Sequence, residues 1–145
     1  MVPITDLDAH LATALRRASN AIDQRLAKAL APHGVTVAEW AVLRTLLATG
    51  PTAPSDLAAR LMLTRGAISK LVERLSAKAL VGRARAGGDG RRMLVTLTGV
   101  GRRLVPTLAT IADAEDETIA ATLQDRAGLE VALRALAGGA KRSGE

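Results

Sequence analysis

The chain has 145 residues, a net charge of +6 and 48% hydrophobic residues, which is enough to form the core of one domain. It contains no cysteine, so thiol-based sensing, disulfides and cysteine-ligated zinc sites are excluded. Phe and Tyr are also absent, and one Trp cannot supply the stacked aromatic side chains on which single-stranded nucleic-acid binders depend.

The beginning of the chain lacks the features of an export signal. Its first ten residues are acidic and polar, where a signal peptide would be basic and then apolar, and no run of 18 apolar residues occurs. We therefore expect a cytoplasmic protein with no membrane partner. With two histidines, His10 and His33, and no cysteine, we expect no transition-metal site and no cofactor.

A long amphipathic helix is predicted before Pro32, which cannot continue it. Thr5 and Asp8 form a capping-box pattern at its start. Its apolar residues recur at spacings of three and four: Leu7, Leu11, Leu15, Ala18, Ile22, Leu26 and Ala29. This stripe is longer than a small domain can cover from within, so we expect a partner chain to cover it.

Two shorter helices are predicted next. Thr36 and Glu39 form a second capping-box pattern, and the helix that they begin ends at Gly50. Its apolar residues are Trp40, Leu43, Leu46 and Leu47. Pro54 suits the first position of the following helix. The buried face of that helix comprises Leu57, Ala58 and Leu61.

A fourth helix begins at Thr64, a good N-cap, after a short connection, and the pair of helices forms a helix-turn-helix unit. Its apolar positions follow the spacing of one helix face: Ile68, Leu71, Val72 and Leu75. The opposite face is polar and comprises Gly66, Ser69, Lys70 and Glu73, flanked by Arg65 and Arg74. Short polar donors with cations beside them fit a recognition helix in the major groove, where Gly66 permits close approach.

A basic β-hairpin follows. Residues 81–86 and 92–97 read as two strands, and the Gly-rich residues 87–90 supply the turn. Arginines line the hairpin at positions 83, 85, 91 and 92, as expected of a wing that enters the minor groove and touches phosphates. Residues 52–97 hold nine Lys or Arg and three Asp or Glu, so their excess equals the +6 of the whole chain. This concentration is typical of a duplex-DNA binder.

Two more helices complete the chain. Thr98 caps a fifth helix of about 25 residues, in which Pro106 is expected to cause a kink. Its apolar stripe comprises Val100, Leu104, Leu108, Ile111, Ala112, Ile119 and Leu123. Asp125 caps a last helix, and residues 138–145 are expected to fray. The stripe of the last helix comprises Leu129, Leu133 and Leu136.

This order of elements resembles the MarR family of bacterial regulators over nearly the whole chain. Residues 89–101, DGRRMLVTLTGVG, are similar to the family's wing pattern, and residues 63–81, LTRGAISKLVERLSAKALV, are similar to its recognition helix. The resemblance implies one mainly α-helical domain over 1–145, with six helices and a small hairpin wing. Residues 36–97 would form the winged helix-turn-helix lobe.

The resemblance also implies a homodimer built by helices in 1–31 and 98–137, which binds a palindromic operator. Arg91 would reach the minor groove and Asp89 would orient it by a salt bridge. The expected DNA-binding residues are Thr64, Arg65, Gly66, Ser69, Lys70, Arg74, Arg85, Asp89 and Arg91. The alternatives are a solvated ion pair for Asp89 and Arg91 and a merely solvated basic face for the fourth helix.

The family usually has Gly where this chain has Ala79, at the end of the recognition helix. A left-handed residue helps a helix to terminate there. The sequence leaves two alternatives, in which Gly82 provides the bend or Ala79 adopts an ordinary conformation.

Family members commonly respond to small, often anionic aromatic ligands held between the dimer helices and the DNA-binding lobe. Trp40 is the one aromatic side chain available for such a ligand, although its helical spacing equally fits core packing. A carboxylate would need a cationic or hydrogen-bonding neighbour, for which His10, Arg17 and Arg44 are the candidates by helical spacing. Aromatic acids such as salicylate are therefore the expected effectors.

The function predicted from these patterns is a dimeric, ligand-responsive transcriptional repressor. A second hypothesis is a constitutive or architectural double-stranded DNA-binding protein with no effector. A third is a small enzyme, which is disfavoured because no paired nucleophile and base and no Gly-rich phosphate loop is visible.

Overall fold

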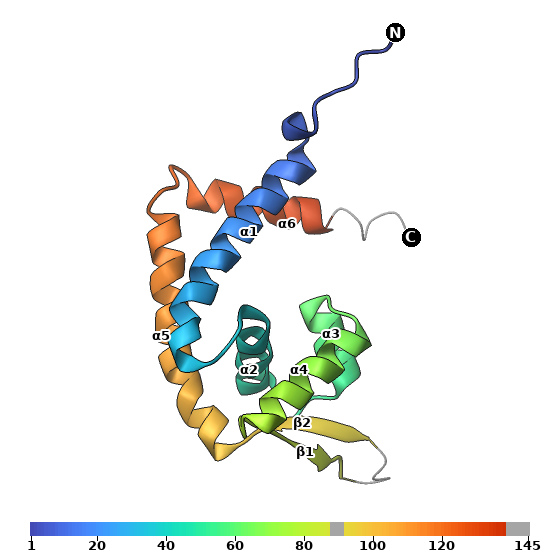
Figure 1. Ribbon diagram of the computed structural model, residues 1–145, viewed down its shortest axis with the longest axis vertical. Helices are drawn as coiled ribbons and strands as arrows, with labels where there is room; N and C mark the ends of the chain where they lie inside the picture. Colours follow the sequence, from blue (N-terminus) through green and yellow to red (C-terminus); the bar gives the residue numbers. More distant parts are fainter. Residues whose placement is uncertain (88–91, 139–145) are drawn as a thin grey trace.

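A computed structural model describes residues 1–87 and 92–138. Within these ranges the chain is mainly helical with one antiparallel hairpin (Figure 1), as the sequence predicts. The elements are a 3-10 turn η1 (Leu7–Ala9), α1 (Leu11–Leu30), a second 3-10 turn η2 (Ala31–His33), α2 (Val37–Thr49), α3 (Pro54–Leu61), α4 (Arg65–Ala77), β1 (Val81–Arg85), β2 (Met93–Leu97), α5 (Gly99–Ala120) and α6 (Arg126–Gly138). None of the described helices is long and apolar enough to cross a membrane.

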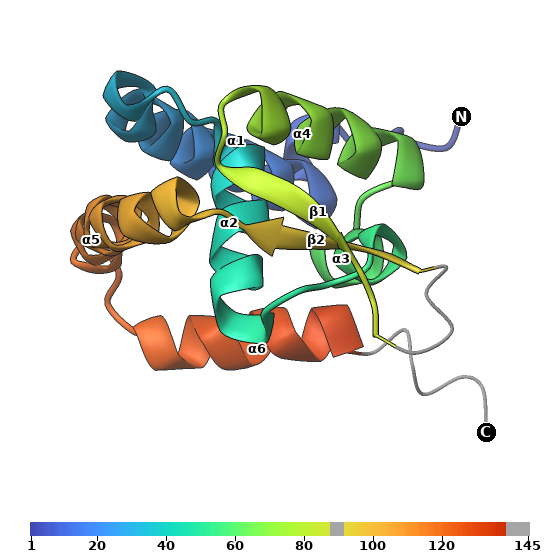
Figure 2. The ribbon, with the colours of Figure 1, turned by 90° about the horizontal axis from the view of Figure 1, so that it is seen from below.

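The N-terminus and the hairpin lie at opposite ends of the molecule, and α5 extends from the hairpin alongside α1 (Figure 1). The central helix α2 contacts α1, α3, α4, α5 and β2. Figure 2 shows the hairpin running beside α4 and past α3. This arrangement places the two basic elements, α4 and the hairpin, next to each other.

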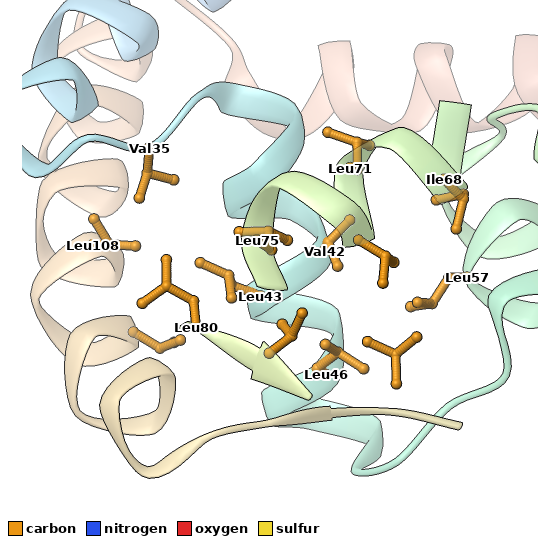
Figure 3. Packing of buried hydrophobic residues seen from close by; sticks show 14 of the residues in the cluster. Val35, Val42, Leu43, Leu46, Leu57, Ile68, Leu71, Leu75, Leu80 and Leu108 are labelled. Carbon is orange, nitrogen blue, oxygen red and sulfur yellow. The ribbon is translucent and has the colours of Figure 1, made fainter. Parts of the chain in front are cut away.

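The hydrophobic core lies around α2 and fixes the orientation of α4. Figure 3 shows side chains from α2, α3, α4 and α5 meeting there. The fully buried Leu and Ile side chains are Leu30, Leu43, Leu46, Leu57, Ile68, Leu75 and Leu108. Burying such a side chain contributes about 1.5–3 kcal/mol, so the packing stabilises one position of α4 on α2.

Threonine caps begin three helices at the predicted positions. The hydroxyls of Thr36, Thr64 and Thr98 accept hydrogen bonds from the backbone N–H groups three residues later, at 3.1, 3.1 and 3.0 Å. Asp125 caps α6 in the same way through the N–H of Gly128, at 2.8 Å. These caps satisfy backbone donors that have no partner inside the helix.

The predicted start of the first helix is wrong. Asp6, rather than Thr5, accepts from the Asp8 N–H at 3.2 Å and caps the short turn η1. The helix α1 begins afterwards at Leu11, with His10 as an N-cap that makes no side-chain cap bond. An aspartate carboxylate at Asp6 therefore closes a local turn that competes with the helix.

The hairpin forms where it is predicted, with each strand one residue shorter, and it has one additional partner. Val81 pairs with Leu97 and Arg85 with Met93. Thr52 forms a bridge to Val95 through bonds of 3.0 and 2.8 Å, which ties the connection between α2 and α3 to the hairpin. No sequence pattern predicts this contact, because a single bridging residue has no periodicity.

Helix α5 is continuous from Gly99 to Ala120, and Pro106 lies on its exposed side. It ends before Leu123, which was predicted to belong to its stripe and instead lies in the connection to α6. Of the tail predicted from residue 138, Gly138 ends α6, and residues 139–145 lie outside the described ranges.

Both alternatives considered for Ala79 are wrong. Ala79 is left-handed, with φ of 59°, and Gly82 lies inside β1. The N–H of Leu80 donates to the Leu75 carbonyl at 3.0 Å and the N–H of Ala79 to the Ser76 carbonyl at 2.9 Å, which is the Schellman pattern. Burial of Leu80 holds the turn despite the Cβ of Ala79.

Replacing Ala79 with glycine should raise the free energy of unfolding by about 0.5–1 kcal/mol. The left-handed conformation costs an alanine about 1–2 kcal/mol, and the greater freedom of glycine in the unfolded chain offsets part of the gain. Thermal or urea unfolding measures the change. The control is Ala77→Gly in the last turn of α4, which should be destabilising, and a loss of stability at both positions would contradict the assignment.

Candidate nucleic-acid interface

The helix α4 presents a polar face to solvent because its apolar face is fully used by the core. Ile68, Leu71, Val72 and Leu75 are buried. The predicted DNA-binding residues on this helix are exposed, namely Arg65, Gly66, Ser69 and Lys70. The structure thus brings these four residues together on one surface.

The beginning of α4 is open to a close approach. A Cβ built on Gly66 would meet nothing within 4 Å, so packing inside the chain does not require glycine there. Thr64 is the N-cap of α4, and its hydroxyl oxygen accepts a hydrogen bond from the Ala67 N–H. Its hydroxyl hydrogen remains available to a further acceptor.

The turn before α4 fixes the angle between the two helices of the helix-turn-helix unit. Met62 is left-handed, with φ of 55°, and the N–H of Leu63 donates to the Ala58 carbonyl at 3.0 Å. This closure ends α3 and turns the chain into α4, which packs against α3.

The hairpin is joined to the helix-turn-helix unit by an ion pair. Arg92 lies 3.3 Å from Asp56 of α3, and both side chains are exposed. Arg83 and Arg85 lie on β1, with exposed side chains. The predicted DNA contacts Asp89 and Arg91 lie outside the described residues.

The buried carboxylate of Glu39, on α2, lies beneath α4. Only a capping-box role was predicted for this residue from its sequence pattern. The side chain of Glu39 is 1% exposed. Its Oε1 accepts from Arg74 at 3.1 Å and its Oε2 accepts from Lys78 at 2.6 Å. Lys78 also donates to the Gly34 carbonyl at 2.7 Å. Arg74, predicted to bind DNA, therefore has its guanidinium on Glu39.

These contacts keep Glu39 ionised. Burial alone would raise the pKa of its carboxyl, but hydrogen bonds from Lys78, Thr36 and Arg74 and the charge of Lys78 together lower that pKa below its ordinary value. A signal for the buried position was present in the sequence. Glu39 has the core spacing with Val42, Leu43 and Leu46, which are all buried.

Trp40 lines a hollow of about 270 Å³ between α1, α2 and α5. Its other lining residues are Ile22, Leu26, Ala112, Asp113, Glu115, Asp116 and Ile119. Glu115 pairs with Arg25 at 3.0 Å and Asp116 with Arg126 at 2.7 Å. The hollow is thus apolar with acidic residues along α5.

The structure does not bring the other predicted ligand residues to Trp40. His10 lies twelve residues before Ile22, the lining residue of α1 that is nearer to it in the sequence, which is about 18 Å along a helix. Arg17 pairs with Asp8 at 2.6 Å. Arg44 lines a separate hollow together with Arg60. Helical spacing alone could not show that Arg44 lies away from the Trp40 hollow, because it does not say which side of α2 meets α5.

Residues 33–92, which include α2, α3, α4 and β1, match the model of the MarR family. The chain belongs to the MarR family. Its six helices and hairpin also match solved MarR-type structures. CouR from Rhodococcus jostii RHA1 superposes with a TM-score of 0.80 at 25% identity, over 92% of this chain and 96% of CouR.

Curated relatives are transcriptional regulators by name. This chain is 33% identical over 98 residues to the HTH-type transcriptional regulator TtmR of Methylorubrum extorquens. The alignment covers 68% of this chain and 50% of TtmR. The match therefore spans half the length of TtmR. The HTH-type transcriptional repressor Rv2887 of Mycobacterium tuberculosis is 28% identical over 80% of this chain and 84% of Rv2887.

Proposed function

We propose that this protein is a dimeric transcriptional repressor that binds a palindromic operator through α4 and the hairpin. The observation that carries the proposal is the exposed polar face of α4, with Arg65, Gly66, Ser69 and Lys70 beside the arginines of β1. Such a face suits base edges and phosphates in the major groove. CouR, a solved neighbour, has been observed bound to a 23-mer DNA duplex.

The individual contacts follow from their positions. Arg65 and Lys70 would bind phosphates or guanine, and Ser69 would reach a base edge. Thr64 and Gly66 would let the backbone at the start of α4 approach the groove, and Arg85 would bind phosphate from the hairpin. Asp89 and Arg91 keep the roles in the minor groove that the family resemblance implies.

Replacing Lys70 with glutamine should weaken binding to operator and random duplexes alike. If Lys70 neutralises one phosphate, the slope of log affinity against log salt becomes shallower by about one unit. Fluorescence anisotropy with a labelled duplex at several salt concentrations measures this. Lys28→Gln removes the same charge from α1, outside the proposed interface, and an equal effect of both substitutions would contradict the assignment.

A second copy of the chain is the proposed partner of the exposed apolar residues on α1 and α6. They include Leu7, Leu11, Leu15 and Ile22 on the N-terminal side and Leu129, Leu133 and Leu136 on α6. In the single chain, α6 has no buried residue, although it is amphipathic. A helix with so much exposed apolar surface requires a partner to be stable in water.

The Trp40 hollow is the proposed effector site, with a preference that differs from the one expected from the sequence. The solved neighbour CouR is bound to p-coumaroyl-CoA in its structure. In this chain Asp113 lies on the hollow without an ion pair among the described residues, and Glu115 and Asp116 are also there. A carboxylate ligand would meet these charges, so we propose an apolar or aromatic effector carrying a neutral or cationic group.

Benzylamine should quench Trp40 emission saturably and release operator DNA over the same concentration range, whereas salicylate should do neither. The reason is that the ammonium group gains from Asp113 and from the indole face, while a carboxylate is repelled. Benzyl alcohol serves as the neutral control of the same size. A response to salicylate and not to benzylamine would contradict the proposed preference, and no response to any of the three would favour the constitutive DNA-binding alternative.

A further inference from the structure

Three cations follow one another along α4 and its C-cap. Lys70, Arg74 and Lys78 are spaced four residues apart, so each lies about 6 Å further along the helix than the one before. Lys70 is exposed and makes no ion pair within the part of the chain that the structure describes. Arg74 and Lys78 both lie on the carboxylate of Glu39.

The carboxylate of Glu39 holds these two cations firmly because it is buried. A buried carboxylate must be paired, since it has lost its contacts with water. The two cations are 51% and 39% exposed, so each could otherwise swing its charged end into solvent or onto a phosphate. A DNA phosphate at the surface would have to compete with Glu39 for these two cations. It would do so in a medium of high dielectric constant, where ion pairs are weak.

We propose that Glu39 is a positioning residue that withholds Arg74 and Lys78 from the DNA backbone and thereby raises selectivity for the operator. This inference rests on the proposed binding of duplex DNA by α4. Cations that touch phosphates increase affinity for every sequence equally. By retaining two of the three cations in the row, Glu39 limits this unselective affinity, and its bonds to α4 keep the helix at a fixed angle on α2.

The test compares salt slopes on a random-sequence duplex. In the otherwise unchanged chain, Arg74→Gln and Lys78→Gln should leave the slope unchanged, whereas Lys70→Gln should reduce it by about one unit. In a Glu39→Gln chain, the freed cations should make the slope steeper, and Arg74→Gln should then reduce it by about one unit. Glu39→Gln should also increase random-duplex affinity several-fold and lower the ratio of operator to random affinity.

Glu73→Gln supplies the matched control. Glu73 is exposed, lies next to Arg74 in the sequence and makes no ion pair among the described residues. Its replacement removes one negative charge from α4 without freeing Arg74. In that background, Arg74→Gln should still leave the slope unchanged, which separates release of a cation from a general change of charge.

The proposal is overturned if Arg74→Gln in the unchanged chain reduces the slope as much as Lys70→Gln does. It is equally overturned if Glu39→Gln folds normally, by circular dichroism, and leaves the slope and the selectivity ratio unchanged. Since Arg74 and Lys78 are partly exposed, their single variants should fold and decide the question even if Glu39→Gln does not. Failure of the proposed function differs from both, because Lys70→Gln would then have no effect and the unchanged chain would not bind duplex DNA.

Discussion

Replacing Gly101 with alanine should lower the free energy of unfolding by about 1–3 kcal/mol, the range for overpacking a close contact. A Cβ at Gly101 would meet the backbone carbonyl oxygen of Leu80, which cannot move without shifting the start of β1. The same Leu80 carbonyl accepts from the Thr98 N–H at 3.1 Å. Added bulk would therefore separate α5 from the hairpin, and urea unfolding measures the loss.

Gly99→Ala is the control for this substitution. It adds the same methyl group two residues earlier in the same helix, but its near neighbour is the flexible end of Arg103 at 3.3 Å. We expect little change or a small gain in stability, because alanine favours the helix more than glycine does. Equal destabilisation by both substitutions would show that the close approach of Leu80 is not the cause.

Replacing Leu133 and Leu136 together with lysine should convert the proposed dimer to a monomer and reduce operator affinity by a factor of 100 or more, on the order of 3 kcal/mol. Both side chains are exposed in the single chain, so the change should cost no core packing. A monomer holds one half-site and loses the gain from binding two linked half-sites. Sedimentation and anisotropy on the same samples measure the two effects.

The control for the dimer variant is Val131→Lys. Val131 is the most exposed apolar residue of α6, at 65%, and lies about 200° around the helix from Leu129. We expect it to retain the dimer and full operator affinity. A double lysine variant that stays dimeric would place the dimer contact elsewhere on the chain.

Most of the helices and the hairpin could be predicted because their signals are local. Thr36, Thr64 and Thr98 each cap a helix through an N–H three residues away, and that spacing can be read directly from the sequence. The apolar periodicity of α4 likewise identified its exposed face. The start of the first helix was predicted wrongly because Asp6 caps the separate turn η1, whereas α1 begins at Leu11 without a side-chain cap bond, so no capping pattern marks its first residue.

The contacts that remained hidden join distant parts of the sequence. Glu39 and Arg74 are 35 residues apart, and a capping-box pattern offered a sufficient local explanation for Glu39. The acidic lining of the Trp40 hollow depends on how α5 packs against α1 and α2. Ala79 is left-handed because the burial of Leu80 and two backbone bonds fix the turn, and no local preference of alanine indicates that.

We propose that α4 and the hairpin read a palindromic operator. The most direct test of this proposal is selection of bound duplexes from fragmented genomic DNA, followed by titration of the recovered sequence against a scrambled version at physiological salt. We expect a two-fold symmetric sequence whose half-site centres lie about one helical turn apart, bound at least a hundredfold more tightly than the scrambled duplex. Recovery of no common sequence, or equal affinity for both duplexes, would contradict it.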